Sequence, residues 1–391
     1  MKDSGKIGIL TGGGDVPGLN SVIKSVVYRA SEMGRSVVGI RKGWEGLTNL
    51  DATQPMDSRY ARLLTRENTR AIDRSGGTVL HTSRTNPARM RKSVLPATIT
   101  QAELDSLARD DDTFDFTPIV LRNLEKLGIS CLVVIGGDDT LGYAAKLYAA
   151  GFPVIAIPKT MDNDVRGTEY CVGFSTAITR AKELVTRQRT TLGSHERIGI
   201  FRIFGRDAGF TALYTAYVTS ARCVIPEFAF DLDLLLGLLM EDKRNNPSNY
   251  ALLIASEGAT WATQNVEDYG VADAYGHRKK KNIGEVLAEV IHERTHEETM
   301  VSDLTYDLRS GDPDAVDQVV ATTFANLALD LIASGVFGRM VAVREGRYAH
   351  APLPDPALGP RKVDVAKLYN TRRYRPQYSG KLGDPLFLIS A

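Results

Sequence analysis

The stretch KIGILTGGGDVPGLNSVIKSVVYRASEMG (Lys6–Gly34) decides the fold class, because it joins an apolar run to an amphipathic stretch through a glycine-rich turn. The run Ile7–Leu10 is continuously apolar, which is typical of a strand buried on both faces. In the helix expected from about Leu19 to Met33, apolar side chains recur at helical spacing at Val22, Val26, Val27 and Ala30. The stretch therefore predicts a strand–turn–helix unit of an α/β fold.

The same order recurs in CLVVIGGDDTLG (131–142), which is followed at once by a third strand in FPVIAIPKTMDNDV (152–165). Further strand patterns and helix patterns follow at Arg197–Gly205, Tyr250–Gly258, Gly338–Gly346, Ile283–His296 and Ala315–Ala333. Buried strands that alternate with helices predict parallel sheets with helices on both faces. We expect two such α/β lobes, with a ligand cleft at the carboxyl ends of their strands.

Composition excludes several classes of function. The chain has 391 residues, a formal net charge of +1, and 43% apolar and 24% charged residues, so it lacks the broad basic excess of a nucleic-acid-binding protein. No apolar run reaches the roughly 18–20 residues that span a bilayer, and the N-terminal MKDSGKIGIL lacks the apolar core of a signal peptide. Three widely spaced cysteines, Cys131, Cys171 and Cys223, argue against a disulfide framework. We expect a cytoplasmic protein without nucleic-acid or membrane partners.

Two segments lie outside the α/β pattern. Glu103–Pro118 is expected to be a surface insertion. The proline-rich stretch His350–Lys362 is expected to be extended and leads to a basic, aromatic tail, LYNTRRYRPQY (368–378). We expect this tail to form a solvated or subunit-contacting surface, because an isolated basic patch on a neutral chain is weak support for nucleic-acid binding.

The glycine-rich turn Thr11–Asn20 could hold a phosphate, because glycines let the backbone approach an anion and the following helix presents free N–H groups. It is neither a dinucleotide-binding fingerprint nor a Walker A loop, since the spacing differs and no Gly-Lys-Ser/Thr follows. Taken alone, the turn is equally consistent with a purely structural corner.

The segment PKTMDND (Pro158–Asp164) supplies the parts that phosphoryl transfer needs. Asp162 could accept a proton from an attacking hydroxyl, and Lys159 could neutralise a phosphate. The alternative is a turn rich in Asp and Asn, which favour turns for their own reasons. Arginines near turns could clamp phosphate, although a single one is more often a surface residue; the candidates are Arg84, Arg197, Arg206 and Arg309.

The segment EVIHERTHEET contains His292-Glu293-x-x-His296, the spacing of a zinc-protease helix. Its apolar neighbours Leu287, Val290 and Ile291 favour an ordinary amphipathic helix instead. We do not expect zinc chemistry there.

Taken together, GGGDVPGLN, GGDDT, PKTMDND, GRDAG, SEG and YDLR occur in the order seen in phosphofructokinases, from Lys6 to about Arg347. The resemblance implies a two-lobed fold, with the active site in the cleft between the lobes, that phosphorylates the 1-hydroxyl of fructose 6-phosphate with Mg²⁺. It also implies a donor-binding lobe formed by 1–172 with approximately 309–345. The sugar-phosphate lobe would comprise approximately 173–308 with 346–391, including the C-terminal tail.

The resemblance assigns a role to individual residues. It implies that Asp162 is the general base, that Asp138 lies at the metal site, and that Arg84 and Arg206 stabilise the transferred group. Lys159 and Asp139 would join Asp162 and Arg206 as catalytic residues. The implied donor-binding residues are Gly13, Gly14, Arg84, Gly137, Asp139 and Lys159. The implied sugar-phosphate residues are Thr160, Met161, Asp162, Arg197, Phe204, Gly205, Arg206, Glu257, Tyr306 and Arg309.

Two positions bear on the phosphoryl donor. ATP-using phosphofructokinases have glycine where this chain has Asp139 and Lys159, so the pair resembles the branch that uses pyrophosphate. A carboxylate at position 139 would repel the α-phosphate of ATP, and Lys159 could stabilise charge on a shorter donor. An ordinary Asp–Lys ion pair, an ATP-dependent enzyme that tolerates Asp139, and a catalytically silent regulatory subunit remain the alternatives. A silent subunit need not keep Asp138 together with the catalytic residues.

The sugar-phosphate pocket departs from the pattern of ATP-using bacterial relatives. Met300 stands where they have an arginine that reaches a neighbouring subunit, and Tyr306 stands where they have histidine. The pocket therefore carries fewer charges, and sedoheptulose 7-phosphate is an additional possible acceptor. A homodimer or homotetramer is expected.

Overall fold

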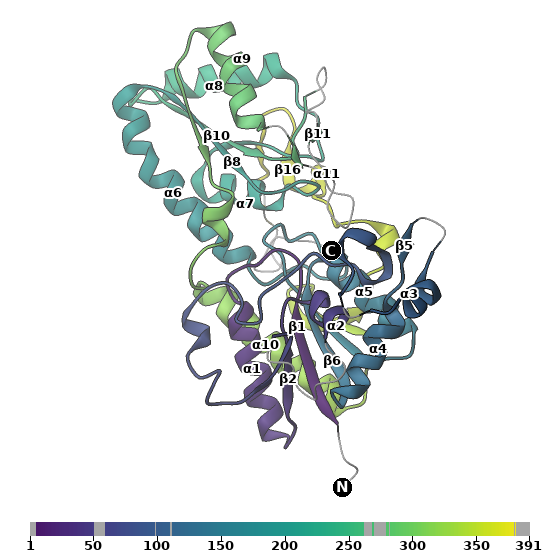
Figure 1. The fold of residues 1–391 in the computed structure, drawn as a ribbon. Helices are drawn as coiled ribbons and strands as arrows, with labels where there is room; N and C mark the ends of the chain where they lie inside the picture. Colours follow the sequence, from purple (N-terminus) through teal and green to yellow (C-terminus); the bar gives the residue numbers. More distant parts are fainter. Residues whose placement is uncertain are drawn as a thin grey trace.

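The computed structural model describes residues 5–50, 59–97, 99–109, 112–261, 268–269, 279–280, 282–378 and 380. They form two lobes, each built on its own sheet (Figure 1). The two expected α/β lobes are thus present, and the all-parallel pairing of the smaller sheet agrees with the sequence prediction.

The larger sheet has a parallel centre and an antiparallel strand at each edge. In spatial order its strands are β15 (Arg347–Pro352), β14 (Arg339–Arg344), β7 (Val154–Pro158), β6 (Ile129–Gly136), β1 (Lys6–Thr11), β2 (Val37–Ile40) and β3 (Ala61–Leu64). The expected lobe boundary near residue 345 falls inside the β14–β15 hairpin, so by its pairing β15 stays with the larger sheet.

Helices cover both faces of this sheet, which explains why its central strands are apolar throughout. On one face lie α1 (Leu19–Glu32) and α10 (Ala315–Ala333); on the other lie α2 (Trp44–Asn49), α4 (Thr117–Lys126) and α5 (Asp138–Ala149) (Figure 1). Successive side chains of β1 point to opposite faces of the sheet. Ile9 packs in the core on the α1 side, and Leu10 packs in the core on the α2 side. This is the two-sided burial that a continuous apolar run predicts.

The smaller sheet contains β13 (Thr299–Asp303), β8 (Ile198–Ile203), β10 (Ala251–Ser256) and β9 (Arg222–Val224). Around it lie α6 (Phe174–His195), α7 (Phe210–Thr219), α8 (Leu232–Asn245) and α9 (Ile283–Thr295). Helix α6 begins against the larger lobe, where the buried carboxylate of Asp317 on α10 accepts hydrogen bonds from the backbone N–H groups of Gly173 (2.9 Å) and Thr176 (2.8 Å). It ends next to β8, so one helix joins the two lobes.

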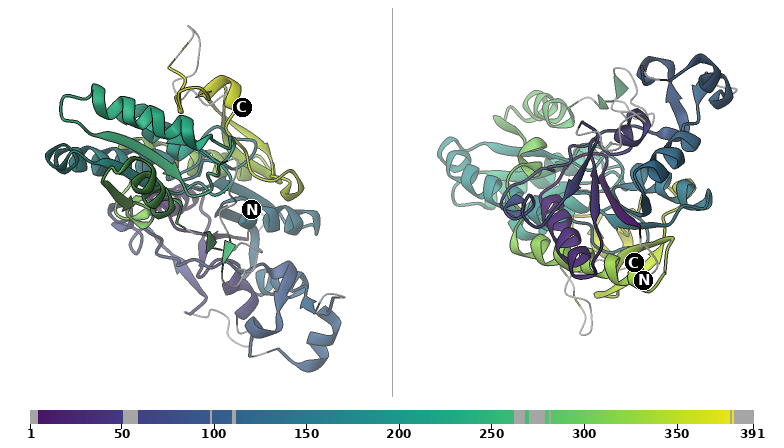
Figure 2. Two further views of the ribbon diagram at one scale, coloured as in Figure 1. Left: turned by 90° about the horizontal axis from the view of Figure 1, so that it is seen from above. Right: turned by 60° about the horizontal axis from the view of Figure 1, so that its bottom comes forward.

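Short elements complete the fold. They are η1 (Ile72–Arg74), η2 (Pro87–Arg89), β4 (Met90–Arg91), η3 (Lys92–Val94), α3 (Gln101–Leu107), β5 (Thr113–Phe114), β11 (Asp268–Tyr269), β12 (Lys279–Lys280), η4 (Tyr306–Arg309), η5 (Pro356–Leu358), α11 (Val365–Leu368), β16 (Tyr369–Asn370) and β17 (Arg375–Pro376). The expected insertion Glu103–Pro118 contains part of α3, strand β5 and the start of α4, and its residues 110–111 lie outside the described part. All three views place α3 and β5 at an outer edge of the larger lobe (Figures 1 and 2).

The basic, aromatic tail differs from the expectation of a solvated surface. Tyr369 and Tyr374 are buried in the core of the smaller lobe, and the Tyr369 hydroxyl donates to the carbonyl oxygen of Cys223 (2.6 Å). Arg372 and Arg373 remain exposed. The aromatic residues of the tail therefore serve packing, and the tail beyond residue 380 lies outside the described part.

Helix α10 is the one helix in the described ranges long and apolar enough to cross a membrane, and it packs against α1, α6, β7 and β14. All three cysteines are buried and free.

Candidate active site

A cavity of about 600 Å³ lies between the two lobes. The carboxyl ends of strands from both sheets reach it, which is where open α/β sheets hold their ligands. Most of the residues singled out from the sequence line this cavity, namely Gly13, Gly14, Arg84, Gly137, Asp138, Asp139, Lys159, Thr160, Asp162, Phe204, Arg206, Glu257, Tyr306 and Arg309.

Three expected site residues do not line the cavity. The side chain of Met161 is buried in the core, and its carbonyl oxygen accepts a hydrogen bond from the Thr211 hydroxyl (2.7 Å). Gly205 acts through its backbone, since its carbonyl oxygen accepts from the Ser256 hydroxyl (2.7 Å). Both residues shape loops next to the cavity.

Arg197 is separated from the cavity by the whole length of β8. It precedes the first residue of this six-residue strand, whereas the cavity lies at the strand's other end. Six residues at about 3.3 Å each make that separation about 20 Å. The structure therefore does not bring Arg197 to the cleft of its own chain, contrary to the expectation that it lies near the sugar phosphate.

The glycine-rich turn is held close to cations from two other segments. Gly13 has a φ of 78°, which favours glycine, and a Cβ atom there would lie 3.3 Å from the Lys159 Nζ. A Cβ atom at Gly14 would overlap the guanidinium group of Arg309. The Lys159 ammonium group donates to the Gly14 carbonyl oxygen (2.6 Å). The turn thus meets a lysine from the end of β7 and an arginine that follows the smaller sheet.

Lys159 is buried, with 3% of its surface exposed. Burial lowers the pKa of Lys159 to about 8, and the positive charge of Arg309 acts in the same direction. The negative charges of Asp15 and Asp164 oppose this effect. The ammonium group is therefore a cation that a bound phosphate would stabilise.

Asp162 lies in the turn after β7, where its backbone N–H donates to the Thr160 hydroxyl (3.1 Å). Burial raises the pKa of Asp162 well above its ordinary value, and the charges of Asp164 and Glu257 add to the shift. Its buried Oδ1 atom has no hydrogen-bond partner among the described residues. Asp162 is thus a carboxylate of raised proton affinity that faces the cavity, as a general base requires.

Asp138 and Asp139 are the first two residues of α5, where the helix N-terminus carries partial positive charge. Burial raises the pKa of Asp138 to about 8, and the charges of Asp164 and Asp139 contribute. Burial likewise raises the pKa of Asp164 to about 6. Asp164 and Asp207 also line the cavity, but neither was given a role from the sequence. The position of Asp164, two residues after Asp162 in PKTMDND, was the signal that could have identified it.

Asp138 and Asp164 fit a magnesium site that the donor would complete. Mg²⁺ commonly binds through one or two carboxylates together with substrate phosphates and water. The charge of Asp164 raises the proton affinity of the buried Asp138 carboxylate, and a divalent cation would relieve this repulsion. Within the described ranges, no cluster of three or more His, Cys, Asp or Glu side chains forms a preassembled metal site.

The zinc-protease spacing has no matching geometry. His292 lies within α9, whereas His296 follows the helix with a φ of 58°. The two imidazoles therefore do not extend from consecutive turns of one helix.

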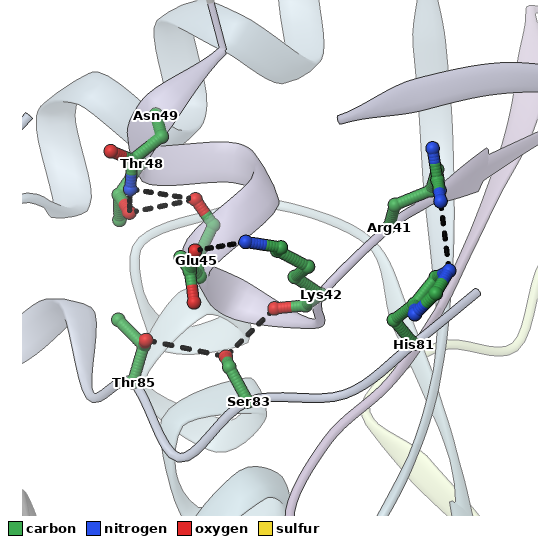
Figure 3. Close-up of polar contacts among 8 residues, drawn as sticks. All are labelled: Arg41, Lys42, Glu45, Thr48, Asn49, His81, Ser83 and Thr85. Carbon is green, nitrogen blue, oxygen red and sulfur yellow. Dashed lines mark hydrogen bonds and ion pairs between the residues drawn. The ribbon is translucent and has the colours of Figure 1, made fainter. Parts of the chain in front are cut away.

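Arg84 is carried by a loop that is tied to the glycine-rich turn. The N–H of Gly13 donates to the Ser83 carbonyl oxygen (3.0 Å), and the Thr82 hydroxyl donates to the Gly13 carbonyl oxygen (2.6 Å). The Ser83 hydroxyl also donates to the Lys42 carbonyl oxygen (2.7 Å) (Figure 3). Arg84 therefore directly follows two residues, Thr82 and Ser83, that are anchored to the backbone of neighbouring segments.

The turn before α2 is held in place by its own polar contacts. The Lys42 ammonium group contacts the Glu45 carboxylate (3.1 Å), and Arg41 bonds to the ring of His81 (2.8 Å) (Figure 3). This turn contacts the loop that carries Arg84 at two places, through His81 and through Ser83.

The smaller lobe contributes an aromatic and cationic wall. The Arg309 guanidinium group lies 4.4 Å from the centre of the Phe204 ring, and the rings of Phe204 and Tyr306 lie 6.0 Å apart. Tyr306 is 77% exposed, so it is open to a ligand.

Arg202 is a cavity residue that was missed from the sequence. Its guanidinium group bonds to Glu257 (3.1 Å) and Asp303 (2.7 Å), and its side chain is 13% exposed. Arg202 therefore fixes the carboxylate of Glu257 from the next-to-last residue of β8. A charged residue inside the apolar run RIGIFRIFG was the available signal.

The segment after β15 also lines the cavity. The sequence predicted only an extended stretch there, but Pro354, Asp355, Pro356, Gly359 and Pro360 form part of the wall beside α5. Nothing in the local sequence pattern predicted that this segment lies beside α5, from which it is more than 200 residues away in the chain.

The chain is similar in sequence to known phosphofructokinases. A sequence model of a family described as "Phosphofructokinase" matches residues 6–332. The chain is 36% identical to the pyrophosphate–fructose 6-phosphate 1-phosphotransferase of Streptomyces coelicolor, over 92% of this chain and 97% of that protein. It is 35% identical to ATP-dependent 6-phosphofructokinase 3 of the same organism, over 87% of this chain and 91% of that protein.

Among solved structures, the chain resembles a pyrophosphate-dependent phosphofructokinase from Marinobacter aquaeolei with a TM-score of 0.72 and 16% identity. The alignment covers 99% of this chain and 92% of that one. At this identity the likeness supports the fold. Relatives named for either phosphoryl donor lie at nearly equal identity, so the donor must be argued from individual residues.

Proposed function

Because the chain belongs to the phosphofructokinase family, we propose that it transfers a phosphoryl group from pyrophosphate to the 1-hydroxyl of fructose 6-phosphate, reversibly. The products are fructose 1,6-bisphosphate and phosphate. The observation that carries the choice of donor is the buried ammonium group of Lys159, bonded to the Gly14 carbonyl oxygen in a cavity that Asp139 also lines.

Asp162 is the general base of this reaction. It accepts the proton of the 1-hydroxyl, whose oxygen forms a bond to the nearer phosphorus atom of pyrophosphate while the bridging P–O bond breaks and phosphate leaves. The raised pKa of Asp162 supports this role, because a more basic carboxylate takes the proton more readily. In the reverse direction the protonated Asp162 returns the proton to the sugar oxygen.

Cationic side chains around the donor neutralise its negative charge during phosphoryl transfer. Lys159, Arg84 and Arg206 line the cavity at positions where a transferred phosphoryl group would be neutralised, and Gly13 and Gly14 let the backbone approach it. Mg²⁺, held by Asp138 and Asp164 together with phosphate oxygens, would neutralise further charge on the donor. Such positioning and charge stabilisation account for most of the catalysis of phosphoryl transfer.

Asp139 sets the length of the donor. It follows Asp138 in the first turn of α5, so its carboxylate adds negative charge where a third phosphate group would have to lie. Like charges brought together in a water-poor site repel strongly. Pyrophosphate avoids this repulsion and still reaches Lys159.

The wider assignments are part of the same proposal. Residues 1–172 with approximately 309–345 bind the donor, and approximately 173–308 with the tail bind the sugar phosphate. The protein acts in the cytoplasm as a homodimer or homotetramer, with sedoheptulose 7-phosphate as an additional acceptor. An ATP-dependent phosphofructokinase is the alternative, because an ATP-dependent relative lies at 35% identity; a catalytically silent subunit is disfavoured by the retained catalytic residues.

A donor panel of pyrophosphate, ATP, GTP and ADP, run in both directions on the purified chain, tests the proposal. We expect turnover with pyrophosphate, and phosphate-dependent formation of pyrophosphate from fructose 1,6-bisphosphate. Activity with ATP and none with pyrophosphate would overturn the donor assignment. No turnover with any donor would point to a silent subunit.

A further inference from the structure

The segment Leu353–Arg361, called the strap below, connects the larger sheet to the tail on the smaller lobe. It follows β15 directly, and five of its residues line the cavity: Pro354, Asp355, Pro356, Gly359 and Pro360. The strap is therefore a wall of the proposed active site that belongs to neither sheet.

The strap is fastened to the loop that carries the proposed base. The Arg166 Nε atom donates to the carbonyl oxygens of Leu358 (3.0 Å) and Gly359 (2.7 Å). The backbone N–H of Arg361 donates to the Asp164 carbonyl oxygen (2.6 Å), and its buried guanidinium group donates to the Asn163 carbonyl oxygen (2.7 Å). These bonds fix the strap relative to the turn that contains Asp162.

The strap also lies directly on α5. A Cβ atom at Gly142 would lie 2.6 Å from the Pro356 Cγ, so Pro356 packs where any other residue would have a side chain. Asp139 and Gly142 are three residues apart on this helix and share a face. The helix face that begins with the Asp139 carboxylate therefore ends, one turn later, under Pro356.

We propose that the strap is a second determinant of donor specificity, which blocks the space that a nucleoside would need. This inference rests on the proposed function and deepens it. Pro356 covers the face of α5 that begins at Asp139, so a donor that extends past Asp139 along this face meets the strap. The Asp355 carboxylate in the same wall adds negative charge there. Asp139 repels the phosphates of a longer donor, and the strap excludes the nucleoside attached to them.

The test combines changes at both places. In the background D139G/K159G, which removes the charges at the donor site, the strap is altered by P354G/P356G. We expect kcat/KM for ATP to rise by about tenfold over the background, with a smaller change for inorganic tripolyphosphate, which has the third phosphate but no nucleoside. The control L358A changes a strap side chain that is 63% exposed and outside the cavity lining, and it should change neither value.

Thermal unfolding and KM for fructose 6-phosphate establish that each variant is folded. If P354G/P356G fails to fold, R166Q loosens the strap from outside the cavity and should give the same selective gain for ATP. An unchanged kcat/KM for ATP in folded strap variants, or an equal gain for ATP and tripolyphosphate, would overturn the inference. Wild-type turnover with pyrophosphate separates this failure from failure of the proposed function, whereas efficient use of ATP by the wild type would overturn both.

Discussion

The Nζ atom of Lys159 lies 2.6 Å from the carbonyl oxygen of Gly14, so the end of β7 is bonded to the turn that follows β1. The two strands are not neighbours in the sheet, since β6 lies between them. The contact therefore joins the two segments that we propose bind phosphate, across β6, the strand that leads into Asp138 and Asp139. Lys159 therefore holds the two segments together and also provides a cation for the proposed phosphoryl donor.

The first prediction concerns pH. Burial lowers the pKa of Lys159 to about 8, and only its protonated form attracts pyrophosphate. We therefore expect kcat/KM for pyrophosphate to fall as pH rises through about 8, because this ratio reports the free enzyme. In K159R the cation persists to higher pH, so this fall should disappear. A profile measured from pH 6 to 10 that is flat in the wild type would contradict this role for Lys159.

The second prediction concerns the choice of donor. Replacing Asp139 by glycine removes the charge that repels a longer donor, and replacing Lys159 as well removes the cation suited to a short one. We expect D139G to raise kcat/KM for ATP, and D139G/K159G to lose use of pyrophosphate. Steady-state assays with both donors measure the change. If use of ATP rises in neither variant, the account of Asp139 is incomplete or wrong.

The third prediction concerns the general base. Without a carboxylate at position 162, nothing accepts the proton of the attacking hydroxyl, so D162A should lower kcat by about 10²–10⁴-fold. Binding of fructose 6-phosphate, followed by calorimetry, should change little. Turnover close to the wild-type rate would place the base elsewhere.

The fourth prediction concerns Arg202. R202M removes both ion pairs of this arginine and frees the Glu257 carboxylate. We expect a larger rise in KM for fructose 6-phosphate than for pyrophosphate, with a smaller effect on kcat. R294M, which breaks an exposed ion pair with Asp233 on the same lobe, is the matched control and should leave both KM values unchanged. Equal effects of R202M on the two substrates would argue against a positioning role.

The fifth prediction concerns stability. Asp317 is fully buried and accepts hydrogen bonds from the Tyr170 hydroxyl (2.7 Å) and from the start of α6. D317A leaves these donors unsatisfied, so we expect a loss of about 3 kcal/mol or more in the free energy of unfolding. Denaturant titration measures the loss. D330A removes an exposed carboxylate from the same helix and should leave the unfolding midpoint unchanged; similar effects of the two changes would contradict the capping role.

Local pattern was enough to predict the frame of the fold. The helix expected at Ala315–Ala333 has those bounds in the structure, and the apolar run Ile7–Leu10 lies within β1. The polar clusters GGGD, GGDDT and PKTMDND follow strands whose parallel order brings their carboxyl ends together. Their convergence on one cavity could therefore be predicted once a parallel sheet was inferred.

The remainder depends on contacts between distant segments, which periodicity does not encode. Burial of Tyr369 against Cys223 and the packing of Pro356 on Gly142 each join parts of the chain more than 100 residues apart. For Arg197, by contrast, the family resemblance implied a ligand-binding role, but the residue precedes β8. It therefore lies at the amino end of that strand, whereas the cleft of its own chain lies at the carboxyl end.

The position of the strap late in the chain has a consequence for biosynthesis. A ribosome completes every strand of the larger and the smaller sheet before it adds residue 353, so a nascent or truncated chain that stops there contains both sheets and lacks a wall of the cleft. Such a chain also lacks Tyr369 and Tyr374 from the core of the smaller lobe. A segment made after the strands of both sheets therefore completes the core of the smaller lobe and, under the proposed function, the wall that selects the donor.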